Sequence, residues 1–463
     1  MPIISPLIPY HFFRAAWAFR YLRGDGLRRY QDARARRIIA FARARSPFYR
    51  EHWHGLDERD WRDFPTIDKA AMMANFDTFN TQSITQDEAF AVALRAERER
   101  DFAPTISKGG GNITVGLSSG TSGHRGAFLV SPPETAAWAG TVLQRVLHTL
   151  PRRGYRVAFF LRSNSNLYER VGGRVRFRYF DLMTQITEQI AALNDYAPNL
   201  IVAPPSLLTA LADAASRGNL RARPEKIVSV AETLEAHDKT VLETAFGVAV
   251  GQIYQCTEGF LAATCPHGRL HVNEDLVALQ YEPLPGSATM PPSAKQVSPV
   301  VTDLWRRTQP IIRYRLGDIL TLANAPCPCE SDFQVIESVG GRCDDLCYFP
   351  DVATGEPRRF YPDTVRRMVL LADSAKQVSP VIADYAAIQT APGNLSVHLA
   401  VTGNADFAAV ETAVRVSIAQ VLAQYHCRAE RIEVIEGLPP TAPGAKRRRI
   451  INRGERPPEE RAI

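Results

Sequence analysis

The feature that most constrains the fold of this chain is an alternation of apolar strand-like segments with helix-like segments through its middle. The strand-like segments are AFLVS (127–131), RVAFFL (156–161), LIVAPP (200–205), KIVSVAE (226–232) and VAVGQIY (248–254). Helix-like segments lie between them, among them PPETAAWAGTVLQRVLHTL (132–150), which begins with proline. Strands that alternate with helices form a largely parallel sheet with helices on both faces. The sequence therefore predicts an α/β fold.

The segments on either side of this region differ in character. The first hundred residues have a mostly helical pattern; Pro47 should break one helix, and Asp68 should cap a later one. After about Gly340 the pattern becomes that of a shorter α+β segment, ending in the strand RIEVIEGL (431–438). A chain of 463 residues is expected to form two to three domains.

Composition excludes several classes of protein. Apolar residues make up 45% and charged residues 22%, as in an average globular protein, and this argues against disorder. We expect no membrane span, because no apolar stretch is long enough, and residues 1–25 make a poor signal peptide. Seven scattered cysteines suit reduced thiols, which favours a cytoplasmic location.

The positive charge is concentrated in two stretches. The net charge is +6, and residues 28–45 and 446–453 contribute much of the excess. Such stretches bind nucleic acid, bind phosphate-bearing small ligands or form solvated helix faces, and the last is the most common case. No RNA-binding aromatic signature or zinc-finger spacing accompanies them, so no nucleic-acid partner is expected.

A loop rich in glycine and hydroxyl residues, GLSSGTSGHRGAFLV (116–130), is a candidate anion site. It lacks the Lys-Ser/Thr pair of a P-loop and leads into a strand, so it is expected to lie within a hairpin. Backbone amides and hydroxyls of this loop could wrap a polyphosphate, and the guanidinium of Arg125 could pair with it. The loop residues concerned are Ser118, Ser119, Gly120, Thr121, Ser122 and Gly123. The alternative is a surface turn without a ligand.

Five segments resemble, in the correct order, the motifs of the adenylate-forming acyl-CoA synthetases. The loop at 117–126 resembles their Ser/Thr/Gly-rich loop, IYQCTEG (253–259) their Y-G-x-T-E motif, with Gln255 replacing glycine, and RYRLGD (313–318) their Y-R-T-G-D motif. GRCDDL (341–346) resembles G-R-x-D-D, and LPPTAPGAKRRR (438–449) resembles P-x-T-x-x-G-K-x-x-R, with Ala445 before the lysine. Residues 44–53 and 63–76 resemble the phenylacetate–CoA ligase branch of this superfamily.

The resemblance implies a domain organisation and a set of roles. It implies a large N-terminal α/β domain at 1–342, which binds ATP and the acid, and a smaller mobile C-terminal α+β domain at 343–463. The 118–123 loop and Arg125 would hold the β- and γ-phosphates of ATP, which leave as pyrophosphate. The other implied roles are Tyr254 against the adenine, Thr257 at the α-phosphate, Glu258 as a Mg²⁺ ligand and Asp318 with Arg342 at the ribose.

Two residues of the C-terminal region are implied in the catalytic cycle. Lys446 resembles the lysine that bridges the carboxylate and the α-phosphate during adenylation, with Arg447 as the alternative because of the shifted spacing. Asp344 resembles the hinge about which the C-terminal domain rotates. Lys446, Glu258 and Arg125 are therefore the expected catalytic residues.

Cysteine and histidine residues form two pairs of potential metal ligands, CPHGRLH (265–271) and CPC (327–329). Thiolates with an imidazole suit a tetrahedral structural Zn²⁺, and the alternative is a set of buried reduced thiols. The phenylacetate–CoA ligase branch contains members with a comparable site. This resemblance implies Cys265, His271, Cys327 and Cys329 as ligands, with His267 as the alternative to His271.

These features together predict an enzyme that activates a small carboxylic acid, expected to be aromatic, with ATP and Mg²⁺. The acyl group would then pass to a thiol, either coenzyme A or the phosphopantetheine of an acyl carrier protein. The alternatives are an adenylyltransferase that acts on a cofactor-like acceptor and, in another class, a zinc-stabilised nucleic-acid-binding protein. The sequence does not identify the acid or the oligomeric state.

Overall fold

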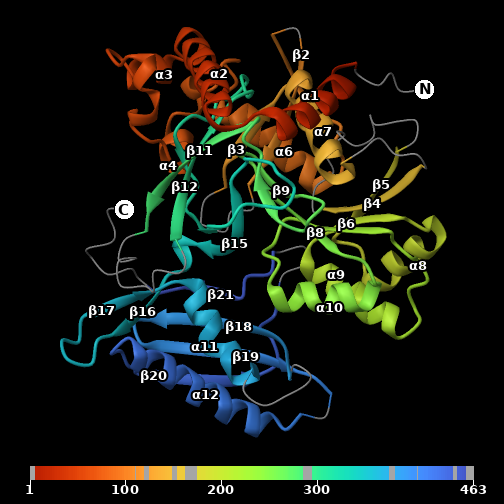
Figure 1. The fold of residues 1–463 in the computed structure, drawn as a ribbon, viewed down its shortest axis with the longest axis vertical. Coiled ribbons are helices and arrows are strands. Elements are labelled where there is room, and N and C mark those ends of the chain that lie inside the picture. Colours follow the sequence, from red (N-terminus) through yellow and green to blue (C-terminus); the bar gives the residue numbers. More distant parts are fainter. Residues whose placement is uncertain are drawn as a thin grey trace. The chain divides into compact units, whose positions relative to one another are not determined.

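The computed structural model of the protein describes residues 6–109, 111–118, 125–148, 154–161, 175–284, 295–374, 381–403, 405–441 and 446–454 (Figure 1). The chain divides into two compact units. Unit 1 comprises residues 1–283, 291–316 and 321–338, and unit 2 comprises residues 284–290, 317–320 and 339–463. The expected boundary at residue 342 and the mobility of the C-terminal domain stay predictions.

The first hundred residues are mainly helical, as the sequence predicts. The helices are α1 (Leu7–Tyr21), α2 (Gly24–Arg45), α3 (Pro47–His52), α4 (Lys69–Ala74), α5 (Phe76–Phe79) and α6 (Gln86–Glu99). Helix α2 ends at Arg45, before Pro47. The carboxylate of Asp68 accepts a hydrogen bond from the Ala71 amide at 2.8 Å and so caps α4. Both of these boundary predictions are confirmed.

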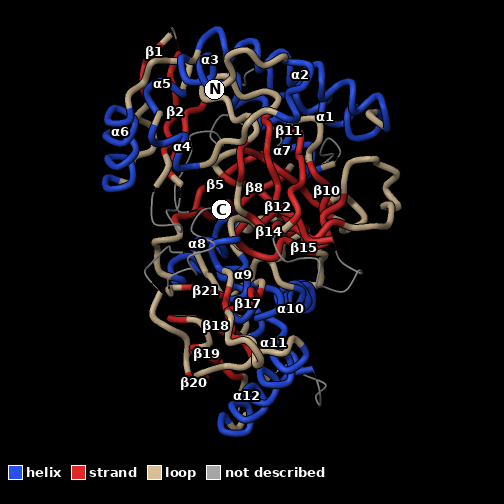
Figure 2. Tube along the Cα trace, turned by 90° about the vertical axis from the view of Figure 1, so that its left-hand side faces the viewer, coloured by secondary structure: helices blue, strands red, loops and turns tan. Residues whose placement is uncertain are grey.

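The main sheet has twelve strands among the described residues, and most of them lie in unit 1; Figure 2 draws the strands in red. Its parallel half contains β4 (Tyr155–Leu161), β5 (Val175–Asp181), β6 (Leu200–Ala203), β7 (Lys226–Ser229) and β8 (Val250–Cys256), in the order β8-β7-β6-β4-β5. Strands β6 and β7 fall within predicted segments, and β4 and β8 overlap theirs to within two residues, so the α/β fold is confirmed for this half.

The other half of the sheet makes it mixed rather than largely parallel. Its strands are β9 (Gly259–Thr264), β10 (Leu270–Val272), β11 (Val277–Pro283), β12 (Lys295–Asp303), β13 (Tyr314–Arg315), β14 (Asp318–Leu322) and β15 (Val335–Arg342). Antiparallel pairs join β8 to β9, β9 to β10, β10 to β15 and β11 to β12. Short turns replace crossover helices between several of these strands, and short turns can join only antiparallel neighbours.

Helices pack against both halves of the sheet. The helices α8 (Ile186–Tyr196), α9 (Pro205–Ser216) and α10 (Ala236–Phe246) pack on one face, where Leu208, Leu211 and Leu242 meet Phe160 and other strand residues in one buried cluster. The helix α7 (Pro132–Leu147) contacts β9 and lies against α1. No helix within the described ranges combines the length and apolar character that a membrane span requires.

Unit 2 contains an α+β segment, as the change of pattern after Gly340 predicts. The elements are β16 (Cys347–Pro350), β17 (Pro357–Phe360), α11 (Pro362–Ser374), β18 (Ile382–Ala391), β19 (Asn394–Val401), α12 (Phe407–Gln424), β20 (Arg431–Glu436) and β21 (Ile450–Asn452). Four strands form a sheet in the order β20-β19-β18-β21. Residues of α11 and α12 pack with these strands in a core that includes Val369, Ile418 and Val397.

Candidate active site and metal centre

The glycine- and hydroxyl-rich loop closes a hairpin, as expected. Strands β2 (Gly111–Leu117) and β3 (Ala127–Val130) pair antiparallel within a separate three-stranded sheet, so AFLVS is the returning strand of this hairpin rather than part of the parallel sheet. At the neck, the Ser118 amide donates to the Gly126 carbonyl at 2.8 Å, and the Gly126 amide donates to Ser118 Oγ at 2.7 Å. Five of the predicted phosphate-binding residues, Ser119, Gly120, Thr121, Ser122 and Gly123, lie outside the described residues.

Arg125 stands beside this neck and pairs with a carboxylate. Its guanidinium makes a bidentate pair with Glu97 of α6, with distances of 2.8 and 2.5 Å, and its Nε donates to the Ser118 carbonyl at 3.2 Å. The hydrogen bonds to Glu97 raise the pKa of Arg125. The residue predicted to bind pyrophosphate therefore has a carboxylate partner, which the sequence analysis missed because an acidic residue within a helix carries no local signal.

Glu258 lies at the tip of a second hairpin, where the parallel half of the sheet meets the antiparallel half. Strands β8 and β9 pair antiparallel, with Cys256 opposite Gly259, so the tip consists of Thr257 and Glu258. The Thr257 hydroxyl donates to a Glu258 carboxylate oxygen at 3.0 Å, and Glu258 is buried. This tip follows the carboxyl end of β8, and ligands of open α/β sheets bind at that edge.

Two residues that the sequence analysis did not single out hold this tip. Tyr314 is buried beside Glu258; burial and the charge of this carboxylate raise the pKa of Tyr314 well above its ordinary value. The guanidinium of Arg306, also buried, donates to the Thr257 carbonyl at 2.7 Å and to the Leu129 carbonyl at 3.2 Å. Arg306 therefore ties the β8–β9 tip to β3.

The other predicted residue of this motif is Tyr254, within β8. It is buried, and its backbone pairs with Ala262 beside a bulge in the ladder. Glu232 follows the end of the adjacent strand β7, and its carboxylate accepts hydrogen bonds from the amide and the hydroxyl of Ser206 at 3.1 and 3.0 Å. Tyr254 thus lies within β8, Glu232 follows the carboxyl end of β7, and Glu258 lies in the turn after β8.

Asp318 and Arg342, the predicted ribose ligands, belong to unit 2 together with Asp344. Arg342 Nε lies 3.8 Å from a carboxylate oxygen of Asp318 and 3.8 Å from one of Asp344. The Cys343 amide donates to the Gly317 carbonyl at 2.7 Å, which holds the two motifs together. The structure therefore brings the RYRLGD and GRCDDL motifs into contact.

In the basic tail, Lys446 differs from the three arginines that follow it in its ion pairs. Arg447 and Arg449 both pair with Asp384, at 2.9 and 2.7 Å, and Arg448 pairs with Asp345. Lys446 is exposed, and it makes no ion pair with any residue that the structure describes. This pattern favours Lys446 over Arg447 as the residue available to a ligand.

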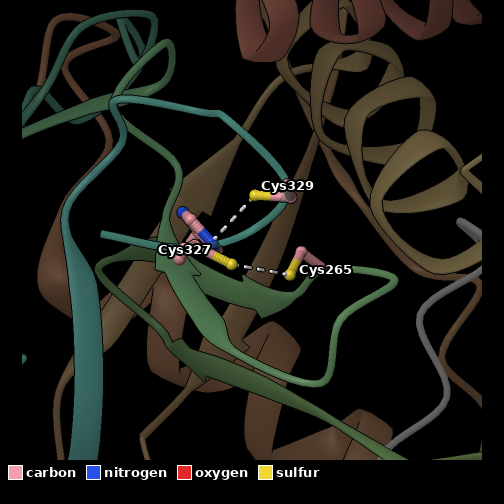
Figure 3. Close-up of side chains that lie close together, drawn as sticks. Cys265, Cys327 and Cys329 are labelled. Carbon is pink, nitrogen blue, oxygen red and sulfur yellow. Dashed lines mark hydrogen bonds between the residues drawn. The ribbon is translucent and has the colours of Figure 1, made fainter. Parts of the chain in front are cut away.

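The four predicted zinc ligands converge within unit 1 (Figure 3). The donor atoms of Cys265, His271, Cys327 and Cys329 all lie within 4.8 Å of one another. Cys265 Sγ is 3.6 Å from Cys327 Sγ, and Cys329 Sγ is 3.3 Å from His271 Nε2. A tetrahedral Zn²⁺ with bonds of about 2.0–2.3 Å separates its donor atoms by about 3.5 Å, so this set fits the metal.

Local structure orients these ligands. A turn at Gly268, with φ of +76°, reverses the chain between Cys265 and His271. His271 Nδ1 lies 2.8 Å from the Phe333 carbonyl, which can only accept a hydrogen bond. Nδ1 therefore carries the proton, and the lone pair of Nε2 faces the thiols, as in metal-bound histidines. His267, the alternative ligand, is exposed on the turn and is not a member of the cluster.

Burial disfavours charge in the cluster when no cation is present. It raises the pKa of Cys265 and that of Cys329, the latter to about 12, and it lowers the pKa of His271. A divalent cation would compensate the charge of buried thiolates, and soft thiolate ligands with one imidazole suit Zn²⁺. The donor chemistry and the distances therefore agree.

Comparisons with known proteins find similarity in fold only. No protein-family model and no curated protein matches the chain. The fold is similar to that of 2-hydroxyisobutyryl-CoA ligase in the postadenylation state in complex with R3-HIB-AMP, with a TM-score of 0.67 and 18% identity over 91% of this chain and 88% of that chain. It is also similar to an acyl acid amido synthetase in complex with 2,4-DB, with a TM-score of 0.57 and 12% identity over 94% of this chain and 90% of that chain. The chain thus has a mixed α/β fold like that of these adenylate-forming enzymes.

Proposed function

We propose that this protein activates a small carboxylic acid with ATP and transfers the acyl group to a thiol. A carboxylate oxygen attacks the α-phosphorus of ATP, the bond to the β-phosphate oxygen breaks, and pyrophosphate leaves. The thiol sulfur then attacks the acyl carbon, and AMP leaves. The acid is an aromatic carboxylate, and the thiol belongs to coenzyme A or to the phosphopantetheine of a carrier protein.

The observation that carries this proposal is the placement of Glu258. It is a buried carboxylate at the carboxyl end of β8, it accepts a hydrogen bond from Thr257, and it belongs to a fold like that of a ligase bound to an acyl-AMP compound. A carboxylate at this edge is a hard oxygen donor for a divalent cation. Mg²⁺ prefers one or two carboxylates together with substrate phosphates, so Glu258 would hold Mg²⁺ on ATP.

The surrounding residues have distinct roles in this proposal. Arg306 positions the Thr257 carbonyl, and Tyr314 orients the carboxylate of Glu258. The loop after Ser118, with Arg125, holds the leaving pyrophosphate. Asp318 offers two acceptor oxygens to the ribose, and Lys446 supplies positive charge at the reacting carboxylate and α-phosphate. Such fixed charges lower the barrier because they are aimed at the transition state.

The first test is ATP–pyrophosphate exchange across a panel of aryl and alkyl acids. The wild-type protein should exchange with at least one aromatic acid. Glu258→Gln should lower the exchange rate by about 100-fold or more, because Mg²⁺ loses its anionic ligand. Glu337→Gln, which changes a half-exposed carboxylate of β15, is the matched control and should exchange normally. Exchange at the wild-type rate by Glu258→Gln would refute the assignment, and the absence of exchange with every acid would refute the activity.

The second test separates the two half-reactions. Lys446→Ala should lower acyl-adenylate formation by orders of magnitude, yet convert pre-made acyl-adenylate and thiol to thioester at nearly the normal rate. Asp344→Pro should have the opposite effect, because proline fixes φ and hinders rotation at the hinge. Coenzyme A, a holo-carrier protein and an amino acid should be supplied separately, since the amino acid tests amide formation. Equal loss of both half-reactions in Lys446→Ala would contradict the alternation of the C-terminal domain.

A further inference from the structure

One face of α1 exposes a stripe of large apolar side chains. Tyr10 is 57% exposed, Phe13 56%, Trp17 51% and Tyr21 60%, and Leu7 at the start of the helix is 39% exposed. Among the residues that the structure describes, the exposed large aromatic side chains are Tyr10, Phe13, Trp17 and Tyr21, and all four lie on α1. A contiguous exposed apolar patch marks an interaction surface rather than ordinary surface composition.

The spacing of these residues places them on a single side of α1. They follow one another at intervals of three or four residues, which aligns side chains along one face of a helix. The opposite face carries Ile8, Phe12, Ala15 and Ala18, which are buried. The buried face therefore accounts for the packing of α1 in unit 1, and the aromatic stripe is not needed for it.

The charges along α1 are positive, and the carboxylates of Asp25 and Asp332 lie by Gly24, beyond its end. The chain has no carboxylate between residues 6 and 24, and the exposed Arg20 and Arg23 lie at the carboxyl end of α1. The guanidinium of Arg20 lies 5.8 Å from the ring centroid of Tyr21. Helix α2 adds the exposed residues Arg28 and Arg29 in its first two turns, and both views show α1 and α2 at the same end of unit 1 (Figures 1 and 2).

We propose that this stripe is a docking surface for an anionic phospholipid bilayer, on which α1 lies parallel to the membrane plane. Trp and Tyr prefer the interface between hydrocarbon and water because their rings are apolar and their NH and OH groups are polar. Arginines beside such a stripe are attracted to anionic headgroups. The stripe fits this partner in both shape and charge.

A second copy of the chain fits the surface less well. Each half-exposed aromatic side chain leaves about 100 Å² of its surface accessible to solvent, so the stripe offers roughly 500 Å² of surface to a partner. A stable protein interface buries about 800 Å² on each partner. Two copies joined through α1 would also bring their arginines together. A helix lying at the headgroup boundary needs only one apolar face, and α1 provides it.

Vesicle flotation tests the proposal with the full-length protein. Phosphatidylcholine vesicles that contain phosphatidylglycerol should carry the wild-type protein, pure phosphatidylcholine vesicles should carry much less, and added salt should reduce binding. The double substitution Trp17→Ser and Tyr21→Ser should lower the partition coefficient by about tenfold or more. The matched control is Met183→Ser with Ile186→Ser, which removes two exposed apolar side chains from another part of unit 1 and should bind normally.

Fluorescence supplies a reading at the stripe itself. Trp17 is the most exposed of the five tryptophans, and the other four remain in Trp17→Phe, so the difference between the emission of the wild-type protein and that of this variant reports mainly on Trp17. That difference should shift to shorter wavelength when phosphatidylglycerol vesicles are added. Wild-type protein that does not bind these vesicles, or the same binding by the Trp17/Tyr21 variant and the wild type, would overturn the proposal. A dimer that the variant converts to a monomer would overturn it in favour of a second copy as the occupant.

Discussion

The metal centre permits the most quantitative prediction, because it joins parts of the chain that are far apart in sequence. The prediction is that the purified protein holds about one Zn²⁺ per chain, and that Cys327→Ser removes most of it. Cys265 and Cys327 are 62 residues apart, and the sulfur atoms of the two residues lie 3.6 Å from each other. A metal that binds both therefore closes a long loop.

The magnitude follows from the entropy of that loop. A cross-link over 62 residues removes about 14 cal/mol/K from the unfolded chain, which corresponds to about 4 kcal/mol at 25 °C. Loss of the metal should therefore lower the free energy of unfolding of unit 1 by up to about 4 kcal/mol. Replacement of one ligand should have nearly the same effect as removal of the metal, since three ligands hold Zn²⁺ weakly.

Elemental analysis and denaturant unfolding measure the two quantities. Protein purified without chelator, chelator-treated protein and Cys327→Ser should be compared, with Cys343→Ser as the control because Cys343 lies outside the cluster. The control should keep its zinc and lose little stability. The reasoning fails if the untreated protein contains no metal, or if Cys327→Ser keeps its full zinc content.

Two further predictions concern carboxylates near the candidate site and the metal centre. Glu97→Gln should release Arg125 from its ion pair and lower the KM for ATP in the exchange assay. The decrease should be up to about fivefold, because a partly exposed ion pair contributes about 1 kcal/mol at most. An increased KM would mean that Glu97 only positions Arg125. Burial raises the pKa of Glu274 from 4.5 to about 7, so the stability that its proton provides is present below about pH 4.5 and is lost as the pH rises through 7. Glu274→Gln keeps an acceptor for the Gln334 amide and should be more stable than wild type by about 3 kcal/mol at pH 8, a difference that should vanish near pH 4.5 in urea unfolding.

The sequence predicted those features that depend on local pattern. Strands β4, β6, β7 and β8 of the parallel half coincide with predicted apolar segments, whereas the charged segment VRFRYFD of β5 was not predicted as a strand. The β2–β3 hairpin follows from glycines and hydroxyl residues that lead into AFLVS rather than into a helix. The spacing within CPHGRLH and CPC indicated two pairs of potential ligands and left buried thiols as the alternative, while the family resemblance implied the set of four that the structure brings together. For the strands and the hairpin, the evidence lay within a few residues of the feature.

Features that depend on distant pairing were not predictable in this way. The segment from Gly259 to Arg342 forms antiparallel strands, and nothing in its local pattern states which strand lies beside which. Glu258 and Tyr314 meet across 56 residues of sequence, and Arg306 reaches the Thr257 carbonyl through the same folding of the sheet. Helix periodicity likewise does not identify Glu97 as the partner of Arg125.

Strand β9 separates the metal centre from the candidate nucleotide site. Glu258 immediately precedes this strand, and Cys265 immediately follows it. Six residues of extended chain span about 20 Å, so a metal held by Cys265 is too far from Glu258 to contact a nucleotide bound there. The zinc would therefore act on the fold and not on the reaction. Zinc-depleted protein, assayed well below its lowered unfolding temperature, should exchange pyrophosphate at nearly the wild-type rate. If the exchange rate instead falls in proportion to the zinc content under those conditions, the two sites are coupled.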